Sequence, residues 1–339
     1  MGTPQRSEAG RLLQGGWLAA CLALLCLGTL APGQAWGGEV RPKRRFRSGQ
    51  KMVYLTKVHT KAAIHCEPPE LLNLFPPLPT NLAMLEQNTV TVKAIHSDGS
   101  TDLDDHFDQF EFQSDLADRV PPNFRDAALK NQQEVNEQVA GQDVIARFDG
   151  DDRLRWFKGG KGFFEKLDLT YREPFRQALM FFLEQVGGDA LYPDHPVKPG
   201  TTWKRKLDSA PSAAYPYTVE GENTLRYVGD SEAAGIRAAV VEFSFVDVLR
   251  PAPEALEKAE PLAQLAAHSL GVDMRIDGQG QGRVLLALDN GRILQEHATL
   301  HQTLRARFDS PTPLPFTKAK SLKLEVQSDS QVDLEGVGR

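Results

Sequence analysis

Residues 294–308 read LQEHATLHQTLRARF, and this stretch decides the fold class. Six of its eight even positions are apolar, whereas its seven odd positions hold only Gln, His, Thr and Arg. Only a β-strand places residues i and i+2 on the same face, so the stretch predicts one long, half-buried strand. A strand of fifteen residues exceeds the usual five or six and has to bend or coil, as strands do in barrels and strongly curved sheets.

The same alternation recurs along the chain. It appears at Phe110-Phe112, at Ala239-Val241-Phe243-Phe245 and at Leu322-Leu324-Val326, with turn residues between the runs. Helical patterns are few, and we expect them at 123–139, 173–186 and 255–270. The sequence therefore predicts a mostly β (α+β) protein, with one or more curved antiparallel sheets or a partial barrel and a few helices.

A glycine-rich stretch, Gly278-Gln279-Gly280-Gln281-Gly282, raises the question of a phosphate-binding loop. Such a loop needs a helix behind it, but an apolar run, Asn290-Gly291 and the long strand follow instead. Asn-Gly between two apolar runs indicates a type I′ hairpin turn. We therefore expect Gly278, Gly280 and Gly282 to permit a bulge or a sharp bend.

An internal duplication is a further hypothesis. Residues 141–157 and 280–297 share the order Gly-Gln, apolar strand, Asp, turn and second strand, and Asn88-Thr89-Val90 and Asn223-Thr224-Leu225 each open an expected strand. The expected organisation is a first β-rich unit with helices at 51–190, a second β-rich unit at 191–330 and a tail at 331–339.

The N-terminal segment resembles a secretory signal peptide. Arg6 and Arg11 precede an apolar run at 18–27, and small residues follow up to Ala35, where we expect cleavage. Two alternatives stay open: a lipoprotein anchored at Cys21, and an uncleaved membrane helix. Residues 36–50 are expected to be a flexible basic segment. The expected location is the periplasm or the extracellular space, with membrane anchoring as an alternative.

The net charge limits the class of binding partner, and the cysteine content limits the possible disulfides. The whole chain has 39 basic and 45 acidic residues; residues 1–35 hold two basic and one acidic, so the remainder carries 37 − 44 = −7. This charge argues against a nucleic-acid partner, and we expect an envelope protein or a lipid instead. After removal of residues 1–35 only Cys66 remains, so no intrachain disulfide can form.

One mid-chain segment resembles a known family. Residues 196–203 read Pro-Val-Lys-Pro-Gly-Thr-Thr-Trp, and this pattern is similar to a family of exported bacterial β-rich proteins, a domain of unknown function, across most of residues 50–310. The resemblance implies an envelope or secreted β-rich protein with no established activity. We interpret Pro196, Pro199, Gly200 and Trp203 as scaffold: a stiff connection, a turn and a buried ring.

Several polar groups in the sequence are candidates for metal binding, ligand binding or catalysis. His297 and His301 share one face of the long strand and could hold zinc with a third ligand, and Arg305 and Arg307 on that face could meet an anion. Two acidic groups could bind a cation, and the one beside His106 could also act as an acid–base pair. The spacing does not match a calcium loop, however, and both groups are interpreted first as hairpin turns. The first group consists of Asp98, Asp102, Asp104 and Asp105 beside His106, and the second of Asp149, Asp151 and Asp152.

A non-catalytic binding or structural role at the bacterial envelope is the favoured function. The sequence predicts no catalytic residue, no cofactor and no metal ligand, and a pairing of Cys66 with His65 is disfavoured because neighbours in a strand face opposite ways. One alternative is a carrier of an apolar ligand or lipid, with Phe175, Phe181 and Phe182 as lid residues. The other is a metal-dependent hydrolase that uses His297 and His301.

Overall fold

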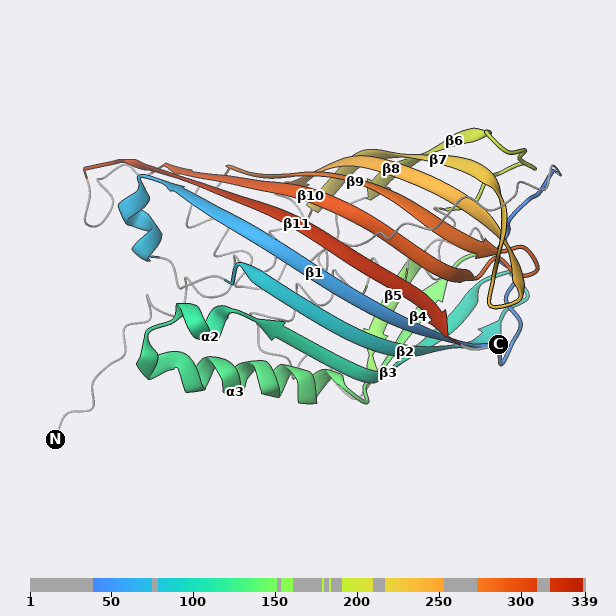
Figure 1. Cartoon of the computed structure of the whole chain (residues 1–339), viewed down its shortest axis with the longest axis horizontal. Coiled ribbons are helices and arrows are strands. Elements are labelled where there is room, and N and C mark those ends of the chain that lie inside the picture. Colours follow the sequence, from blue (N-terminus) through green and yellow to red (C-terminus); the bar gives the residue numbers. More distant parts are fainter. Residues whose placement is uncertain are drawn as a thin grey trace.

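The computed structural model describes residues 39–74, 79–150, 154–160, 179, 183, 191–209, 217–252, 273–309 and 318–337. Within them, eleven strands form one antiparallel sheet in the order β5-β4-β3-β2-β1-β11-β10-β9-β8-β7-β6 (Figure 1). The strands are β1 (Lys51–Glu67), β2 (Asn81–Ile95), β3 (Thr101–Ser114), β4 (Asp143–Phe148), β5 (Leu154–Gly159), β6 (Thr202–Ser209), β7 (Tyr217–Ala233), β8 (Ile236–Pro251), β9 (Asp273–Ala287), β10 (Ile293–Asp309) and β11 (Ser321–Val337). The helices are η2 (Pro69–Leu74), α2 (Leu116–Arg119) and α3 (Pro122–Val139).

Some predictions fall outside the described residues. These are the signal segment 1–35 with Cys21, the helix at 255–270, the residues Asp151 and Asp152, and the lid residues Phe175, Phe181 and Phe182. Of the helix expected at 173–186, the described residues are Leu179 and Leu183, and both are helical. No helix in the described part of the chain is long and apolar enough to cross a membrane.

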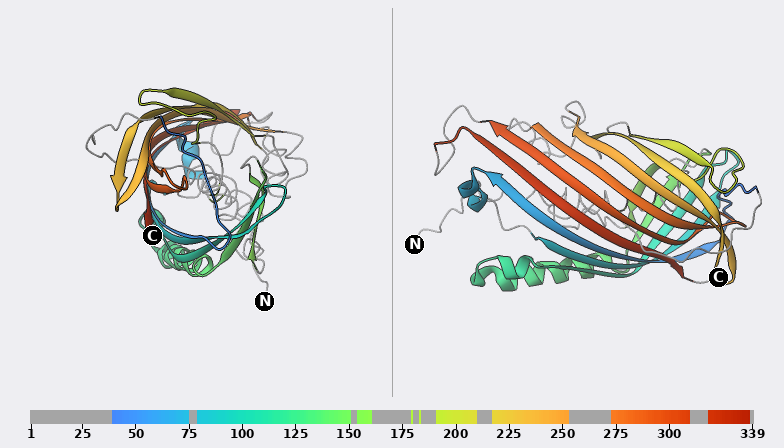
Figure 2. Two further views of the ribbon diagram at one scale, coloured as in Figure 1. Left: turned by 90° about the vertical axis from the view of Figure 1, so that its right-hand side faces the viewer. Right: turned by 45° about the horizontal axis from the view of Figure 1, so that its top comes forward.

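The sheet is strongly curved and open. Figure 2 shows its long strands curling around an interior, with β5 and β6 at the two edges. Because β5 and β6 do not pair with each other in the described residues, the sheet does not close into a barrel. The predicted mostly β fold with a curved antiparallel sheet is therefore confirmed, and both expected β-rich units contribute to this single sheet.

The two faces of the sheet differ in burial. We call the face that carries the core residues the inner face and the opposite face the outer face. On β10 the even residues from Leu294 to Ala306 are buried, as the alternation predicts, and most odd residues are partly or fully exposed. Leu179 and Leu183 pack into the main core cluster of the inner face together with residues from β1–β4 and β6–β11. A second inner cluster, which includes Cys66 and Leu71, lies near the end of β1.

The first and last strands pair in the middle of the sheet. β1 and β11 are antiparallel over Val53–Glu67 and Lys323–Val337, with Val58 opposite Val332. Val332 and Leu334 are buried on the inner face. The predicted tail at 331–339 is therefore wrong for 331–337, because the period-two pattern of β11 continues to its end.

Helix α3 replaces a strand at the exposed part of one sheet edge. β4 pairs only with residues 101–106 of β3, so residues 107–114, which pair with β2 on one side, have no strand on the other side within the described chain. The Asn136 side chain accepts from the Phe112 N–H (2.8 Å) and donates to the Phe112 carbonyl (3.2 Å), and Gln132 accepts from the Ser114 N–H (2.9 Å). The helix thus satisfies backbone groups that an open edge would leave unpaired, and the prediction of a helix at 123–139 is confirmed.

One end of the curved sheet is crossed by the basic N-terminal segment. Val40 forms a β-bridge with Val197, and the Arg45 N–H donates to the Asn290 carbonyl at 2.9 Å. Arg44 is buried and its guanidinium lies 5.0 Å from the centre of the Tyr192 ring. The expected solvation of the basic cluster thus holds for the exposed Arg41, Arg45 and Arg47 and fails for Arg44.

The segment that carries the family resemblance has the expected scaffold geometry. Gly200 adopts a φ of +90°, which favours glycine, and its N–H donates to the Tyr227 carbonyl at 2.7 Å. Trp203, the second residue of β6, is 8% exposed and belongs to the main core cluster. Pro196 and Pro199 flank Val197, which is buried. The turn and the buried ring are therefore as predicted.

The glycine-rich stretch does not form a bulge. β9 pairs with β8 and β10 through Gly278, Gly280 and Gly282 without a register shift, so the predicted bulge is wrong. The glycines make room for side chains of β8. A Cβ on Gly282 would lie 2.1 Å from the Phe243 ring, and one on Gly280 would lie 2.6 Å from the Phe245 ring. Close packing against β8 therefore requires glycine at these positions.

The β9–β10 hairpin is confirmed, but its predicted turn type is wrong. A type I′ turn needs positive φ at both central residues. Gly291 has a φ of +74°, whereas Asn290 is not among the residues with positive φ. Five residues, 288–292, connect the strands, and the Gly291 N–H donates to the Ala287 carbonyl. The predicted strand openings at Asn88 and Asn223 are also wrong, because β2 and β7 begin several residues earlier.

Candidate binding surface

The polar residues of β10 lie on the outer face, opposite acidic residues of β11. His297 is the cross-strand partner of Asp333, and His301 is the partner of Asp329. His297 Nδ1 contacts Asp333 Oδ1, and His301 Nδ1 lies 2.9 Å from Asp329 Oδ1. Each histidine that the sequence analysis considered for zinc is therefore engaged by its own carboxylate.

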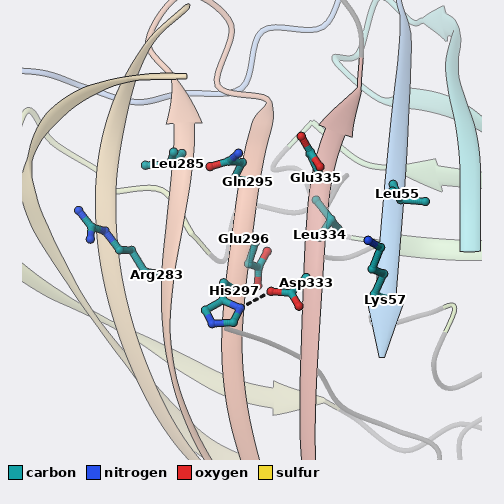
Figure 3. A pocket seen from close by; sticks show the side chains of 10 residues that line it. All are labelled: Leu55, Lys57, Arg283, Leu285, Gln295, Glu296, His297, Asp333, Leu334 and Glu335. Atoms are coloured by element: carbon teal, nitrogen blue, oxygen red, sulfur yellow. Dashed lines mark hydrogen bonds and ion pairs between the residues drawn. The ribbon is translucent and has the colours of Figure 1, made fainter. Parts of the chain in front are cut away.

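A shallow pocket surrounds the first of these pairs. Figure 3 shows His297 and Asp333 with Lys57, Arg283 and Glu335 around them, contributed by β1, β9, β10 and β11. The pocket has a volume of about 220 Å³. Burial lowers the pKa of His297, and the nearby Asp333 carboxylate opposes this change. At neutral pH we therefore expect a neutral imidazole that can accept or donate a hydrogen bond.

A larger groove of about 710 Å³ lies next to this pocket on the outer face. It extends across β8, β9, β10, β11 and β1, and we call it the outer groove. Uncharged polar side chains are the largest group in its lining: Ser244, Gln279, Gln281, Thr299, Ser330 and Gln331. His59, His301, Lys61 and Asp329 also line it. The three glutamine side chains make no hydrogen bond within the described part of the chain, so their amides can serve a ligand.

The charges along this face largely cancel. Arg305 contacts Asp277 at 2.8 Å and Glu325 at 3.1 Å. Arg307 contacts Asp309 at 3.0 Å. Because carboxylates accompany both arginines, the predicted positive stripe that could meet an anion is wrong, and the face carries alternating charges instead.

The described residues contain no group of three or more His, Cys, Asp or Glu side chains placed to hold a metal ion. His297 and His301 are four residues apart on one strand, at about 3.4 Å per residue, which is too far for one zinc ion. The structure thus gives the hydrolase alternative no metal centre within these residues. Cys66 and His65 face opposite sides of β1, as expected, and burial raises the pKa of the Cys66 thiol.

The acidic group around His106 is divided between a turn and the two faces of the sheet. Asp98 stabilises the β2–β3 turn by accepting from the Ser100 N–H at 2.9 Å, which confirms the hairpin interpretation. On the outer face, Asp104 contacts Lys93 at 2.6 Å and His106 contacts Asp143 at 2.8 Å. Asp105 points to the inner face. Asp105 and His106 therefore cannot form an acid–base pair with each other, because adjacent strand residues point to opposite sides.

Asp102 and Asp149, the remaining acidic residues of these two groups that the structure describes, are paired with arginines. Asp102 binds Arg147 through two hydrogen bonds of 2.6 and 2.7 Å, and chiefly this contact lowers the Asp102 pKa to about 2. Asp149 contacts Arg155 across the β4–β5 hairpin. Neither carboxylate is available as a cation ligand without the loss of an ion pair.

A buried polar group on the inner face was missed by the sequence analysis. Glu86 is 7% exposed, Asn88 1% and Asp105 0%. Burial raises the pKa of Glu86 to about 7 and raises that of Asp105 well above its usual value, with the Glu86 charge as the second cause for Asp105. The sequence held a signal: even positions of β2 are apolar at Leu82 and Val90 but polar at 86 and 88.

Comparisons with known proteins do not identify the chain. No family model matches it, and no curated protein matches it. Among solved structures, the monoaromatic hydrocarbon channel CymD aligns with 87% of this chain and 90% of its own, at 10% identity and a TM-score of 0.12. A TM-score this low carries no argument about fold or function. The family resemblance of residues 196–203 stays a prediction.

Proposed function

We propose that this protein has a non-catalytic binding role at the cell envelope and that the outer groove is its binding surface. The lining of the groove is the observation that carries the proposal. Five adjacent strands of one continuous sheet contribute to it, and three glutamine amides in it lack partners within the described residues. Residues on paired strands hold their positions well, so such a surface is preorganised for its ligand.

The chemistry of the groove favours an uncharged ligand rich in hydroxyl groups. Each amide of Gln279, Gln281 and Gln331 offers both donors and an acceptor, and the Thr299 hydroxyl offers both as well. A hydroxyl group of a sugar needs this combination. Charged ligands fit less well, because Lys61 in the groove lies opposite Asp329 on the neighbouring strand, and carboxylates contact Arg305 and Arg307 further along this face. Neutral saccharides are therefore the proposed ligand class.

Binding to an array of neutral oligosaccharides tests this proposal. The wild-type chain should bind, and the Gln281→Leu and Thr299→Val variants should lose at least about tenfold in affinity because each removes a hydrogen-bonding group. Gln113→Leu is the matched control, since Gln113 is exposed on β3, away from the groove. No wild-type binding, or equal loss in the control, would contradict the proposal.

A carrier of an apolar ligand is the second candidate. Apolar residues from most strands line the inner face, and the gap between β5 and β6 leaves the sheet open at one side. This inner face would have to open to admit a ligand, because its core residues are at most 8% exposed. Native mass spectrometry of protein purified from its host without detergent should then show a bound lipid, and a mass equal to that of the chain alone would count against it.

A further inference from the structure

The shallow pocket around His297 adjoins the outer groove along β1, β9, β10 and β11. On β10 the pocket is lined by residues 295–297 and the groove by residues 299–301. His297 and Thr299 are two residues apart on one face of the strand, which is about 7 Å at the usual rise of 3.4 Å per residue. A ligand that lies in the groove can therefore place a substituent in the pocket.

The sizes of the two depressions suit a ligand and one of its side groups. Ligand sites usually measure about 300–1,000 Å³. The outer groove, at about 710 Å³, lies within this range, whereas the pocket, at about 220 Å³, is smaller. The pocket therefore has the size for a branch of a ligand rather than for the ligand itself.

Two rows of side chains line the pocket, and each row takes one residue from β9, β10, β11 and β1 (Figure 3). The rows are Arg283, His297, Asp333 and Lys57, and Leu285, Gln295, Glu335 and Leu55. Leucines stand at both ends of the second row, where Leu55 is half-buried and Leu285 is buried. The Gln295 side chain between them makes no hydrogen bond within the described residues. The pocket thus combines apolar walls with an amide that can serve a ligand.

His297 supplies a hydrogen-bond acceptor. Its Nδ1 contacts Asp333 Oδ1, and a carboxylate can only accept a hydrogen bond, so Nδ1 carries the proton of the neutral imidazole. Nε2, on the other side of the ring, is then an acceptor. Burial lowers the pKa of His297, which favours this neutral form near pH 7.

The pocket has no excess of positive charge with which to hold an anion. Lys57 lies opposite Asp333 on β11, and Arg283 lies opposite Glu242 on β8. An ammonium group would meet carboxylates here, but it would also lose water against the two leucines, which is costly. The lining is best matched by an uncharged group that brings a donor, an acceptor and an apolar part.

We propose that the pocket receives the acetamido group of an N-acetylated amino sugar whose neighbouring sugar units occupy the outer groove. The amide N–H donates to His297 Nε2, the amide carbonyl accepts from the Gln295 side chain, and the methyl group contacts Leu55 and Leu285. A hydroxyl group on the same ring carbon is too short to make all these contacts. The inference rests on the proposed function and narrows its ligand class from neutral saccharides to those that carry an N-acetyl group.

Oligosaccharides that differ only in this substituent test the inference. The probes are two series of tetrasaccharides, one built from glucose and one from galactose, with a hydroxyl, an amino or an acetamido group on the second ring carbon. In isothermal titration calorimetry at pH 7, the acetamido member of at least one series should bind about tenfold or more tightly than its hydroxyl counterpart, because it adds hydrogen bonds and apolar contact.

The outcomes separate this inference from the proposed function. Equal affinity for hydroxyl and acetamido members overturns the acetamido assignment and leaves the proposed function standing. So does binding of other neutral saccharides on the array without binding of either acetamido tetramer. Tightest binding by an amino member also overturns it, because the pocket would then recognise a cation. No binding of any neutral saccharide on the array contradicts the proposed function itself, and the inference falls with it.

Variants assign the preference to the pocket. His297→Leu removes the Nε2 acceptor and Leu55→Ala removes an apolar wall, so each should reduce the preference for acetamido over hydroxyl from about tenfold to about threefold or less. Leu85→Ala is the matched control and should keep the full preference, since Leu85 is a half-buried leucine on the outer face of β2 that does not line the pocket. Gln281→Leu, in the groove, should weaken both members alike. A full preference in both pocket variants would overturn the inference.

Discussion

The buried acids make stability depend on pH in an unusual direction. Burial raises the pKa of Glu86 from 4.5 to about 7. A carboxyl group whose pKa is higher in the folded state binds its proton more tightly there. Its contribution to stability is therefore fully present below pH 4.5 and is lost as the pH rises through about 7. Ordinary paired carboxylates behave in the opposite way.

The magnitude follows from the pKa. Each pKa unit corresponds to about 1.4 kcal/mol, so a rise from 4.5 to about 7 is worth about 3 kcal/mol above pH 7. Glu86→Gln removes this cost because the amide carries no charge. The variant should match the wild type in unfolding free energy near pH 4.5 and should exceed it by up to about 3 kcal/mol at pH 8.

Urea unfolding followed by circular dichroism at pH 4.5, 6, 7 and 8 measures this difference. Glu111→Gln serves as the control, because Glu111 is exposed on the outer face of β3 and should change stability by less than about 0.5 kcal/mol at every pH. The reasoning is refuted if the difference between Glu86→Gln and the wild type is independent of pH.

Three further variants test the packing and the buried charge by urea unfolding. Gly282→Ala should cost about 2 kcal/mol through overlap with Phe243, and the added change Phe243→Leu should restore part of it; an undamaged single variant would contradict the packing. Asn136→Ala removes both hydrogen bonds to the β3 edge and should lower the free energy of unfolding by about 1–2 kcal/mol. Gln133→Ala, on the exposed side of α3, should lower it by less than about 0.5 kcal/mol. Equal losses in the two variants would argue against capping of the edge by α3. Asp247→Asn should be stabilising by up to about 2 kcal/mol at pH 8 and neutral near pH 4, because burial raises the Asp247 pKa to about 6; a constant difference would contradict this.

The long strands were the most predictable part of the molecule. In β10 the alternation alone predicted the length of the strand and which of its faces is buried, because apolar residues occupy every second position of a half-buried strand. Helix α3 was equally readable from its pattern. Properties that depend on residues distant in the sequence could not be predicted. The pairing of β1 with β11 joins residues far apart in the sequence, and nothing in either strand specifies its partner.

The candidate site residues show the same contrast between what alternation predicts and what depends on strand pairing. Alternation placed His297 and His301 on one face correctly, but it could not show that Asp333 and Asp329 lie opposite them. The bulge at Asp108 shifts the inward-facing positions of β3 by one residue, so a simple alternation cannot follow that strand throughout. The packing of Gly280 and Gly282 against the aromatic rings of β8 could not be predicted either, because it depends on the register between the two strands.

The pairing of β1 with β11 affects how this chain folds during synthesis and how it tolerates truncation. The ribosome releases β11 after the other ten strands of the described sheet, so the edge of β1 that pairs with β11 waits for its partner. Such a long-range pairing favours slow assembly with an exposed intermediate, and it makes the segment that forms β11 indispensable. Removing the seventeen residues of β11, Ser321–Val337, would divide the sheet at its centre rather than shorten it at an edge.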